Sequence, residues 1–154
     1  MKKLVSFLLA ATLTIGCLTG CGANRTGYAI ALITDKGNID DRSFNQGAWE
    51  GVEAYAKANN ITHQYYKPEE ASDEGYLAAI QLAVDGGAKV VVCPGYLFEV
   101  AVFNAQTQFP DVKFILLDGE PHTPDYATYQ TDANVACVMY AEEEAGYLAG
   151  YAAV

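Results

Sequence analysis

Residues 28–51 read YAIALITDKGNIDDRSFNQGAWEG, and this stretch decides the fold. Its first part, Tyr28 to Thr34, is an apolar run that predicts a strand buried on both faces. Ser43 to Asn60 then predicts a helix with Ser43 as its N-cap. The apolar residues of that helix recur at helical spacing: Phe44, Ala48, Val52 and Tyr55. A buried strand followed by such a helix predicts the first unit of a parallel sheet.

The rest of the chain repeats this alternation. Further strands are expected at Thr62–Tyr66, Val90–Cys93, Lys113–Leu117 and Val135–Tyr140, and further helices at Asp73–Gly86, Leu97–Gln108 and Glu142–Val154. Five short strands separated by helices predict an α/β three-layer sandwich, a parallel sheet covered on both faces. Ligands of such sheets bind beyond the carboxyl ends of the strands. The candidate site loops are therefore 34–43, 94–97 and 118–123.

The N-terminus has the pattern of a secretory signal peptide. Two lysines precede a mostly apolar run, Leu4 to Ile15, which is too short for the roughly 20 residues that span a bilayer. Leu18-Thr19-Gly20-Cys21 resembles the lipobox of bacterial lipoproteins, whereas Thr14-Ile15-Gly16-Cys17 fits less well. We therefore expect a signal peptide at 1–20, lipidation of Cys21, a tether at 21–27 and a folded domain at 28–154. The alternative is an ordinary signal peptide with a cysteine nearby.

The charge of the chain excludes some partners. The net charge is −10, and removal of residues 1–20 takes away two lysines and no acid, which leaves 7 basic and 19 acidic side chains. Such a surface argues against nucleic acid and anionic lipid headgroups as partners. It does not oppose attachment to a membrane through a lipid at one end, because two acyl chains anchor a protein stably.

The chain shows no motif for catalysis, metal or cofactor. Cys93 and Cys137 lie in apolar runs, which favours two buried thiols, with a disulfide as the alternative. The acidic loop from Asp35 to Asp41 departs from a calcium-binding loop, and no phosphate-binding glycine loop is present. His63 and His122 have no matching nucleophile motif. We therefore expect a protein that is not an enzyme and binds no metal.

Three stretches of the chain resemble the basic membrane protein family of lipoproteins, nucleoside-binding relatives of type I periplasmic binding proteins. They are ITDKGNIDDRSFNQGAWEG at 33–51, VKFILLD at 112–118 and NVACVMYAEEEAGYLAGYAA at 134–153. The resemblance implies the N-terminal lobe of a type I periplasmic-binding-protein-like fold. It also implies a substrate-binding lipoprotein on the extracytoplasmic face of the cell membrane. Such a protein binds a purine nucleoside between two lobes and passes it to an ABC-type permease.

The resemblance also assigns candidate binding residues. In the family, the positions of Asp35, Phe44 and Asn45 line the base site. Their chemistry agrees, because a carboxylate accepts from a base N–H, a ring stacks on a heterocycle and an amide both donates and accepts. Asp118 matches another binding position, and Tyr96 falls where relatives often have Phe and is expected to wall the pocket.

Each candidate has an alternative structural role. Asp35 and Asp118 can close turns, Phe44 can anchor its helix in the core, and Asn45 can bond only backbone. Trp49 and Gly51 are expected to pack, Gly51 at a close contact between helix and sheet, and Asp41 to be solvated or to cap.

Two further expectations concern the whole protein. Val154 falls inside a predicted helix, so we expect a truncated chain without the second lobe. In the family that lobe supplies another aromatic, an acid and a Lys, and half of such a clamp should bind weakly. The loop from Asp118 to His122 also departs from the commoner family versions. The alternative function is a surface lipoprotein that acts through protein contacts, as an adhesin or a regulator.

Overall fold

The computed structural model describes residues 27–154, so the predicted signal peptide and Cys21 lie outside the described residues. The elements along the chain are β1 (Ile30–Ile33), α2 (Phe44–Asn59), β2 (His63–Tyr66), α3 (Asp73–Asp85), β3 (Val90–Pro94), the 3-10 helix η1 (Tyr96–Phe98), α4 (Glu99–Gln108), β4 (Lys113–Leu117), β5 (Val135–Val138) and α5 (Glu142–Ala152). Every predicted strand and helix is present, and the ends differ from the predicted ends by at most two residues. The start of the predicted third helix forms the 3-10 helix η1 instead of an α-helix.

The five strands form one parallel sheet in the order β2-β1-β3-β4-β5. After β1 the chain forms β2 on one side of β1 and then crosses to form β3 on the other side of β1. The strand order therefore reverses between β1 and β3, and this is the point where open parallel sheets place their ligands. The parallel sheet that the sequence predicts is confirmed.

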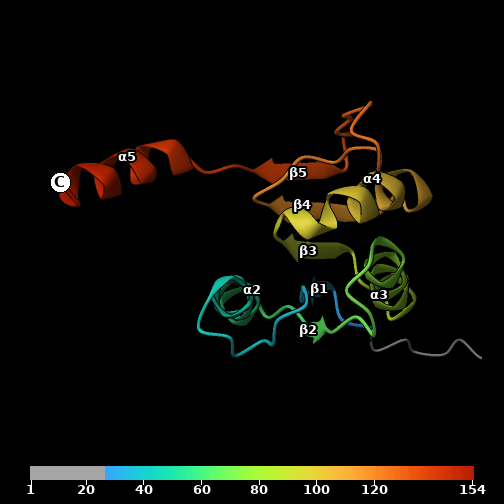
Figure 1. The fold of residues 1–154 in the computed structure, drawn as a ribbon. Helices are drawn as coiled ribbons and strands as arrows, with labels where there is room; N and C mark the ends of the chain where they lie inside the picture. Colours follow the sequence, from blue (N-terminus) through green and yellow to red (C-terminus); the bar gives the residue numbers. More distant parts are fainter. Residues whose placement is uncertain (1–26) are drawn as a thin grey trace, which may run out of the picture.

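Helices pack on both faces of the sheet (Figure 1). Alternate residues of β1 point to opposite faces, as the two-residue period of a strand requires. Ala31 and Ile33 join the larger core cluster with residues of α3 and α4, whereas Ile30 and Leu32 join a smaller cluster beneath α2. The larger cluster holds the bulky buried rings of Tyr76, Phe98 and Phe114.

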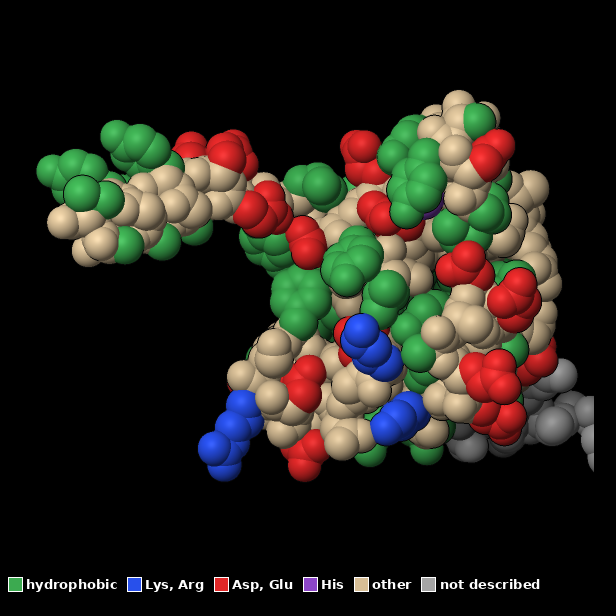
Figure 2. Space-filling view, in the orientation of Figure 1, with side chains coloured by type: hydrophobic (Ala, Val, Ile, Leu, Met, Phe, Trp, Pro, Cys, Tyr) green, Lys and Arg blue, Asp and Glu red, His purple; other side chains and the backbone are tan. Residues whose placement is uncertain are grey.

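Helices lie on both faces of the sheet as predicted, but they leave part of the α2 face uncovered. Helix α5 extends away from the sheet, and every residue from 138 to 154 is exposed (Figure 1). On the α2 face, Ile115 and Leu117 of β4 are only half-buried beside an open groove. Figure 2 shows the hydrophobic side chains that α5 leaves in solvent.

Gly51 lies along the same open groove. A Cβ atom built on Gly51 meets nothing within 4 Å, so the predicted close contact between this glycine and the sheet is wrong. Trp49 does pack as predicted, with its ring centroid 5.4 Å from that of Tyr65 on β2. The two residues differ because α2 leans over β1 and β2 and leaves β4 uncovered.

Cys93 and Cys137 are free thiols as predicted, but only Cys93 is buried, whereas Cys137 is half-buried. Burial raises the pKa of the fully buried Cys93, so its thiol stays protonated and packs as an apolar group. No helix among residues 27–154 combines the length and the apolar character needed to cross a membrane.

Candidate functional site

The predicted site residues gather at the carboxyl edge of the sheet. Asp35 lies two residues beyond β1, Tyr96 follows β3, and Asp118 follows β4 directly. Phe44 begins α2, whose N-terminus faces the same edge because the helix follows the loop after β1. The point of strand reversal therefore lies between Asp35 and Tyr96.

Asp35 is held in place by Asn45. The Asp35 backbone N–H donates to Asn45 Oδ1 at 3.1 Å, and Asn45 Nδ2 donates back to Asp35 Oδ1 at 2.7 Å. The Gly37 N–H adds a third bond, to Asp35 Oδ1 at 2.6 Å. These bonds fix one carboxylate oxygen, Oδ1, and among residues 27–154 the other oxygen accepts no hydrogen bond. The arrangement can present an acceptor to a ligand.

Asn45 is 2% exposed and uses its whole amide inside the protein. Besides its two bonds with Asp35, Asn45 Nδ2 donates to Asp41 Oδ2 at 2.9 Å. The alternative that Asn45 bonds only backbone is therefore wrong. In this arrangement Asn45 orients Asp35, and its direct contact with a ligand stays a prediction.

Asp41 completes this group and begins helix α2. Its Oδ1 accepts from the N–H groups of Ser43 at 2.8 Å and Gln46 at 3.2 Å. Ser43 makes no side-chain cap bond, so the predicted Ser43 cap is wrong and Asp41 performs that role. Burial raises the pKa of Asp41, but hydrogen bonds from Ser43, Asn45 and Gln46 outweigh it and hold the pKa below its usual value.

Phe44 is a surface ring at the mouth of a groove. It is 37% exposed and belongs to neither core cluster, so the alternative of a core anchor is wrong. Its ring meets the edge of Tyr140 with centroids 6.2 Å apart. Both residues line an open groove of about 600 Å³ between α2 and the end of β4. Tyr140 was not predicted, because nothing local in the sequence ties it to a residue so far away.

Gly95 lets the chain turn sharply from β3 toward Tyr96. Its φ of 114° lies in a region that side chains rarely adopt, and its N–H donates to the Leu117 carbonyl at 2.7 Å. A Cβ atom there would lie 3.9 Å from the Phe44 ring. The turn therefore brings the start of η1 close to the first residue of α2, and Tyr96 leaves it 62% exposed.

Asp118 adopts a left-handed backbone conformation with φ 62°, which is uncommon for a residue other than glycine. Its N–H donates to the Val138 carbonyl at 2.8 Å, so its backbone does close the turn after β4. The residue is half-buried and directly follows Leu117, which pairs with Pro94, so Asp118 lies at the level of Gly95. Residues in such conformations concentrate at binding sites. At Asp118 the hydrogen bond to Val138, which closes the turn, is sufficient to explain the conformation.

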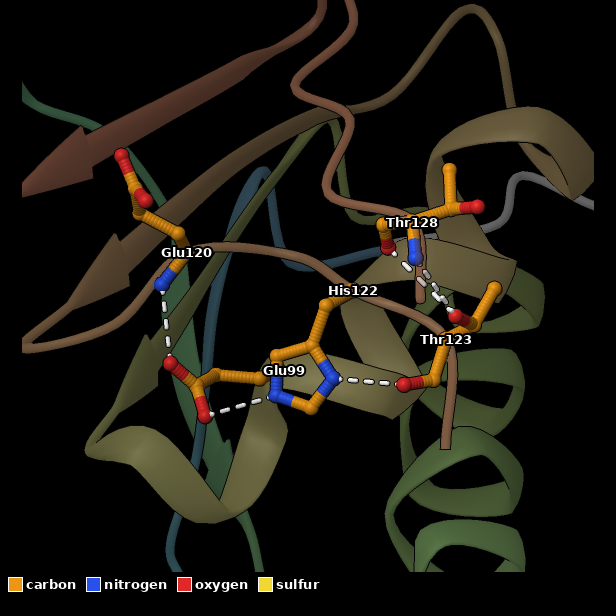
Figure 3. A network of polar contacts seen from close by, with 5 residues as sticks. All are labelled: Glu99, Glu120, His122, Thr123 and Thr128. Carbon is orange, nitrogen blue, oxygen red and sulfur yellow. Dashed lines mark hydrogen bonds and ion pairs between the residues drawn. The ribbon is translucent and has the colours of Figure 1, made fainter. Parts of the chain in front are cut away.

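A second polar group ties the loop after β4 to α4 (Figure 3). Glu99 accepts from the Glu120 N–H at 3.0 Å and from His122 Nε2 at 3.1 Å. His122 Nδ1 faces the Thr123 carbonyl at 2.7 Å, and Tyr126 stacks on the ring at 4.3 Å. Both ring nitrogens of His122 thus lie against oxygen atoms, which fixes the orientation of the ring. These hydrogen bonds hold the loop after β4 against α4. The sequence did not predict the contact between His122 and Glu99.

Among residues 27–154 there is no group of three His, Cys, Asp or Glu side chains that could hold a metal ion. The polar groups at the carboxyl edge are instead an anchored carboxylate and exposed rings. Such a combination is suited to binding an organic solute with a flat ring and an N–H group.

Comparison with known proteins places this arrangement in a family. The model of the family described as "ABC transporter substrate-binding protein PnrA-like" matches residues 29–154. The ABC transporter nucleoside-binding protein BmpA of Lactococcus lactis is 28% identical over 99% of this chain and 44% of its own length. A CD4+ T-cell-stimulating antigen of Listeria monocytogenes is 30% identical over 82% of this chain and 34% of its own. The chain thus spans less than half the length of these relatives.

Solved structures agree with the fold. A solute-binding protein of an ABC transporter system from Aeropyrum pernix superposes with a TM-score of 0.66 over 79% of this chain and 30% of its own, at 23% identity. A second one, from Conexibacter woesei, gives a TM-score of 0.58 over 79% of this chain and 38% of its own, at 25% identity. The predicted fold class is therefore confirmed.

Proposed function

Because the chain belongs to the family of PnrA-like ABC transporter substrate-binding proteins, we propose that it forms the ligand-binding lobe of a receptor for a purine nucleoside. The family consists of solute-binding proteins, so the chain is not an enzyme. In the complete receptor the nucleoside is enclosed between this lobe and a second one and is then delivered to an ABC permease.

One observation carries this proposal. Asp35 is fixed by Asn45 at the point of strand reversal, and the exposed Phe44 ring lies next to Asn45 in the chain. A fixed acceptor beside an aromatic ring suits a heterocycle that carries an N–H group, and aromatic contacts add about 0.5–1.5 kcal/mol beyond buried area. The relative from Lactococcus lactis is named as nucleoside-binding, which supports the same ligand class.

We also propose that Cys21 carries the lipid that anchors the receptor outside the cytoplasmic membrane. The support comes from the Leu18-Thr19-Gly20-Cys21 pattern and from relatives named as lipoproteins. One of these, from Pyrococcus furiosus, is 28% identical over 88% of this chain. Metabolic labelling with palmitate, lost in Cys21→Ser, tests the anchor.

Isothermal titration tests the ligand. The delipidated, full-length product of the reading frame that contains this chain is titrated with adenosine, guanosine, inosine and ribose. We expect heat from a nucleoside but not from ribose, and loss of binding in Phe44→Ala and Asn45→Ala. Tyr55→Ala is the matched control, since Tyr55 is another exposed ring of α2 and lies away from the carboxyl edge. No heat with any of the four from a folded protein would contradict the proposal and favour a role through protein contacts.

A further inference from the structure

Tyr76 carries a buried hydroxyl group without a partner. The residue lies in the first turn of α3, is 2% exposed, and packs on Phe98 with ring centroids 4.5 Å apart. Its hydroxyl oxygen makes no hydrogen bond in the described structure. A buried hydroxyl that forms no hydrogen bond destabilises the folded state, and a phenylalanine would fill the same space without that loss. A functional role would explain why this position carries a tyrosine instead of a phenylalanine.

The position of Tyr76 connects it to the candidate site. Helix α3 follows β2, so its first turn lies at the carboxyl edge, and Phe98 belongs to η1, which follows β3. Burial raises the pKa of Tyr76, and the nearby charges of Asp35, Asp73 and Tyr96 raise it further. The hydroxyl thus keeps its proton at neutral pH and lies near two of the predicted ligand-binding residues.

The other buried hydroxyl without a partner does not share this position. Thr34 Oγ1 also lacks a hydrogen bond, but Thr34 lines a separate pocket with Asn38 and Tyr65. Tyr76 and Phe98 belong to the larger core cluster, which includes Ile33, two residues before Asp35. Because side chains alternate between the faces of a strand, Thr34 points to the same face as Ile30 and Leu32. Tyr76 packs instead in the cluster of the opposite face, which contains Ile33.

We propose that Tyr76 is a further ligand-binding residue, whose hydroxyl donates a hydrogen bond to the bound heterocycle beside the N–H group that Asp35 accepts. The inference rests on the proposed function. A donor next to an acceptor complements the edge of a base that offers an acceptor next to an N–H, as N1 and the 6-amino group do in adenosine or O6 and N1–H in inosine. Tyr96 is exposed at the same edge and belongs to neither core cluster.

The test compares two substitutions that each remove one hydroxyl. Tyr76→Phe removes the proposed contact. Tyr66→Phe is the matched control, because burial also raises the pKa of Tyr66, which is half-buried, and its hydroxyl lies against Gly86 at the far end of α3. Both variants of the full-length product are titrated with inosine and adenosine, and both are unfolded in urea.

We expect Tyr76→Phe to raise the Kd for both nucleosides by about threefold to tenfold, the effect of one lost hydrogen bond. Its urea midpoint should equal or exceed that of the parent, because an unsatisfied buried group is removed. Tyr66→Phe should leave the Kd unchanged. An unchanged Kd in Tyr76→Phe, or a weaker affinity with a matching loss of stability, would overturn the inference alone. A parent protein that binds no nucleoside would overturn the proposed function and this inference together.

Discussion

Asp41 is the residue that joins helix stability to the geometry of the candidate site. It accepts from the N–H groups of Ser43, just before α2, and Gln46, in the first turn of α2, and it also holds the Asn45 amide that orients Asp35. Its pKa lies below the usual value in the folded protein because these hydrogen bonds favour the charged carboxylate. The stabilisation is therefore fully present above the unfolded pKa, near 3.8, and is lost as the pH falls through the folded pKa.

We expect Asp41→Asn to lower the free energy of unfolding at pH 7 by about 1 kcal/mol. The amide keeps one oxygen for the helix N–H groups, but it loses the charge and turns an N–H group toward the Asn45 amide. The difference from the parent should shrink as the pH is lowered below about 4, because the parent carboxylate is then protonated as well. Urea unfolding at several pH values measures both effects. Asp40→Asn, at the exposed neighbouring carboxylate, is the control. A difference that stays constant with pH would contradict this account of Asp41.

The sequence predicts those site residues that lie next to an element end. Asp35 and Asp118 directly follow predicted strands and Phe44 begins a predicted helix, so a strand pattern alone places them at one edge. Tyr140, His122 and Tyr76 were not predicted as site or network residues. Their partners, Phe44, Glu99 and Phe98, lie more than twenty residues away in the chain, and no local periodicity reports such contacts.

The junction between β3 and η1 shows how one glycine shapes an element. The sequence predicts a single helix from Leu97, but the chain forms a 3-10 turn first. Gly95 makes that turn possible with a φ of 114° and a ψ of 156°, a combination that is essentially restricted to glycine. The strand pattern of Val90–Pro94 and the helical pattern of α4 could be predicted. The turn that joins them depends on tertiary contact with Leu117 and could not.

Gly95→Ala should destabilise the protein by roughly 1–3 kcal/mol, because an alanine there is strained. Gly51→Ala should have the opposite sign and stabilise by about 0.5–1 kcal/mol, because Gly51 lies inside α2 and a Cβ there meets no atom. Urea unfolding of the two variants beside the parent measures both. Equal effects of the two substitutions would show that the backbone conformation at Gly95 is not the cause.

The uncovered half of the α2 face has consequences for the molecule as a whole. A parallel sheet is normally covered by helices on both faces, yet Ile115 and Leu117 remain half-exposed while α5 presents Tyr147, Leu148 and Tyr151 to solvent. Both surfaces are apolar, and apolar surfaces of this kind favour association. The sequence pattern of α5 predicts the helix correctly, but whether it packs on the sheet depends on contacts that a helical pattern does not encode.

We therefore expect the 154-residue chain to associate as its concentration rises and to bind a dye such as ANS that reports exposed apolar surface. Leu148→Lys should weaken the association, because it places a charge on the apolar surface of α5. Lys57→Arg, a conservative change at an exposed residue of α2, is the control. Sedimentation velocity over a range of concentrations measures the mass. A chain that stays monomeric throughout and binds no dye would show that α5 folds back onto its own sheet.

The last consequence concerns affinity. Small-molecule sites bury about 70–90% of the surface of their ligand, whereas the carboxyl edge of this sheet offers an open surface on one side. The chain spans 44% of the nucleoside-binding relative from Lactococcus lactis, and the proposed ligand contacts from a second lobe are not among its residues. We therefore expect the 154-residue chain to bind nucleosides far more weakly than the full-length product does.

Weak binding should still occur at the predicted place, because Asp35 is already fixed by bonds within this lobe. In an NMR titration with inosine, the amide signals of Asp35 and Gly37 should shift, whereas that of Gly86, at the opposite end of α3, should not. Phe44→Ala should abolish the shifts. A submicromolar affinity for the isolated chain would contradict the two-lobed receptor, since a single open edge would then suffice to hold the ligand.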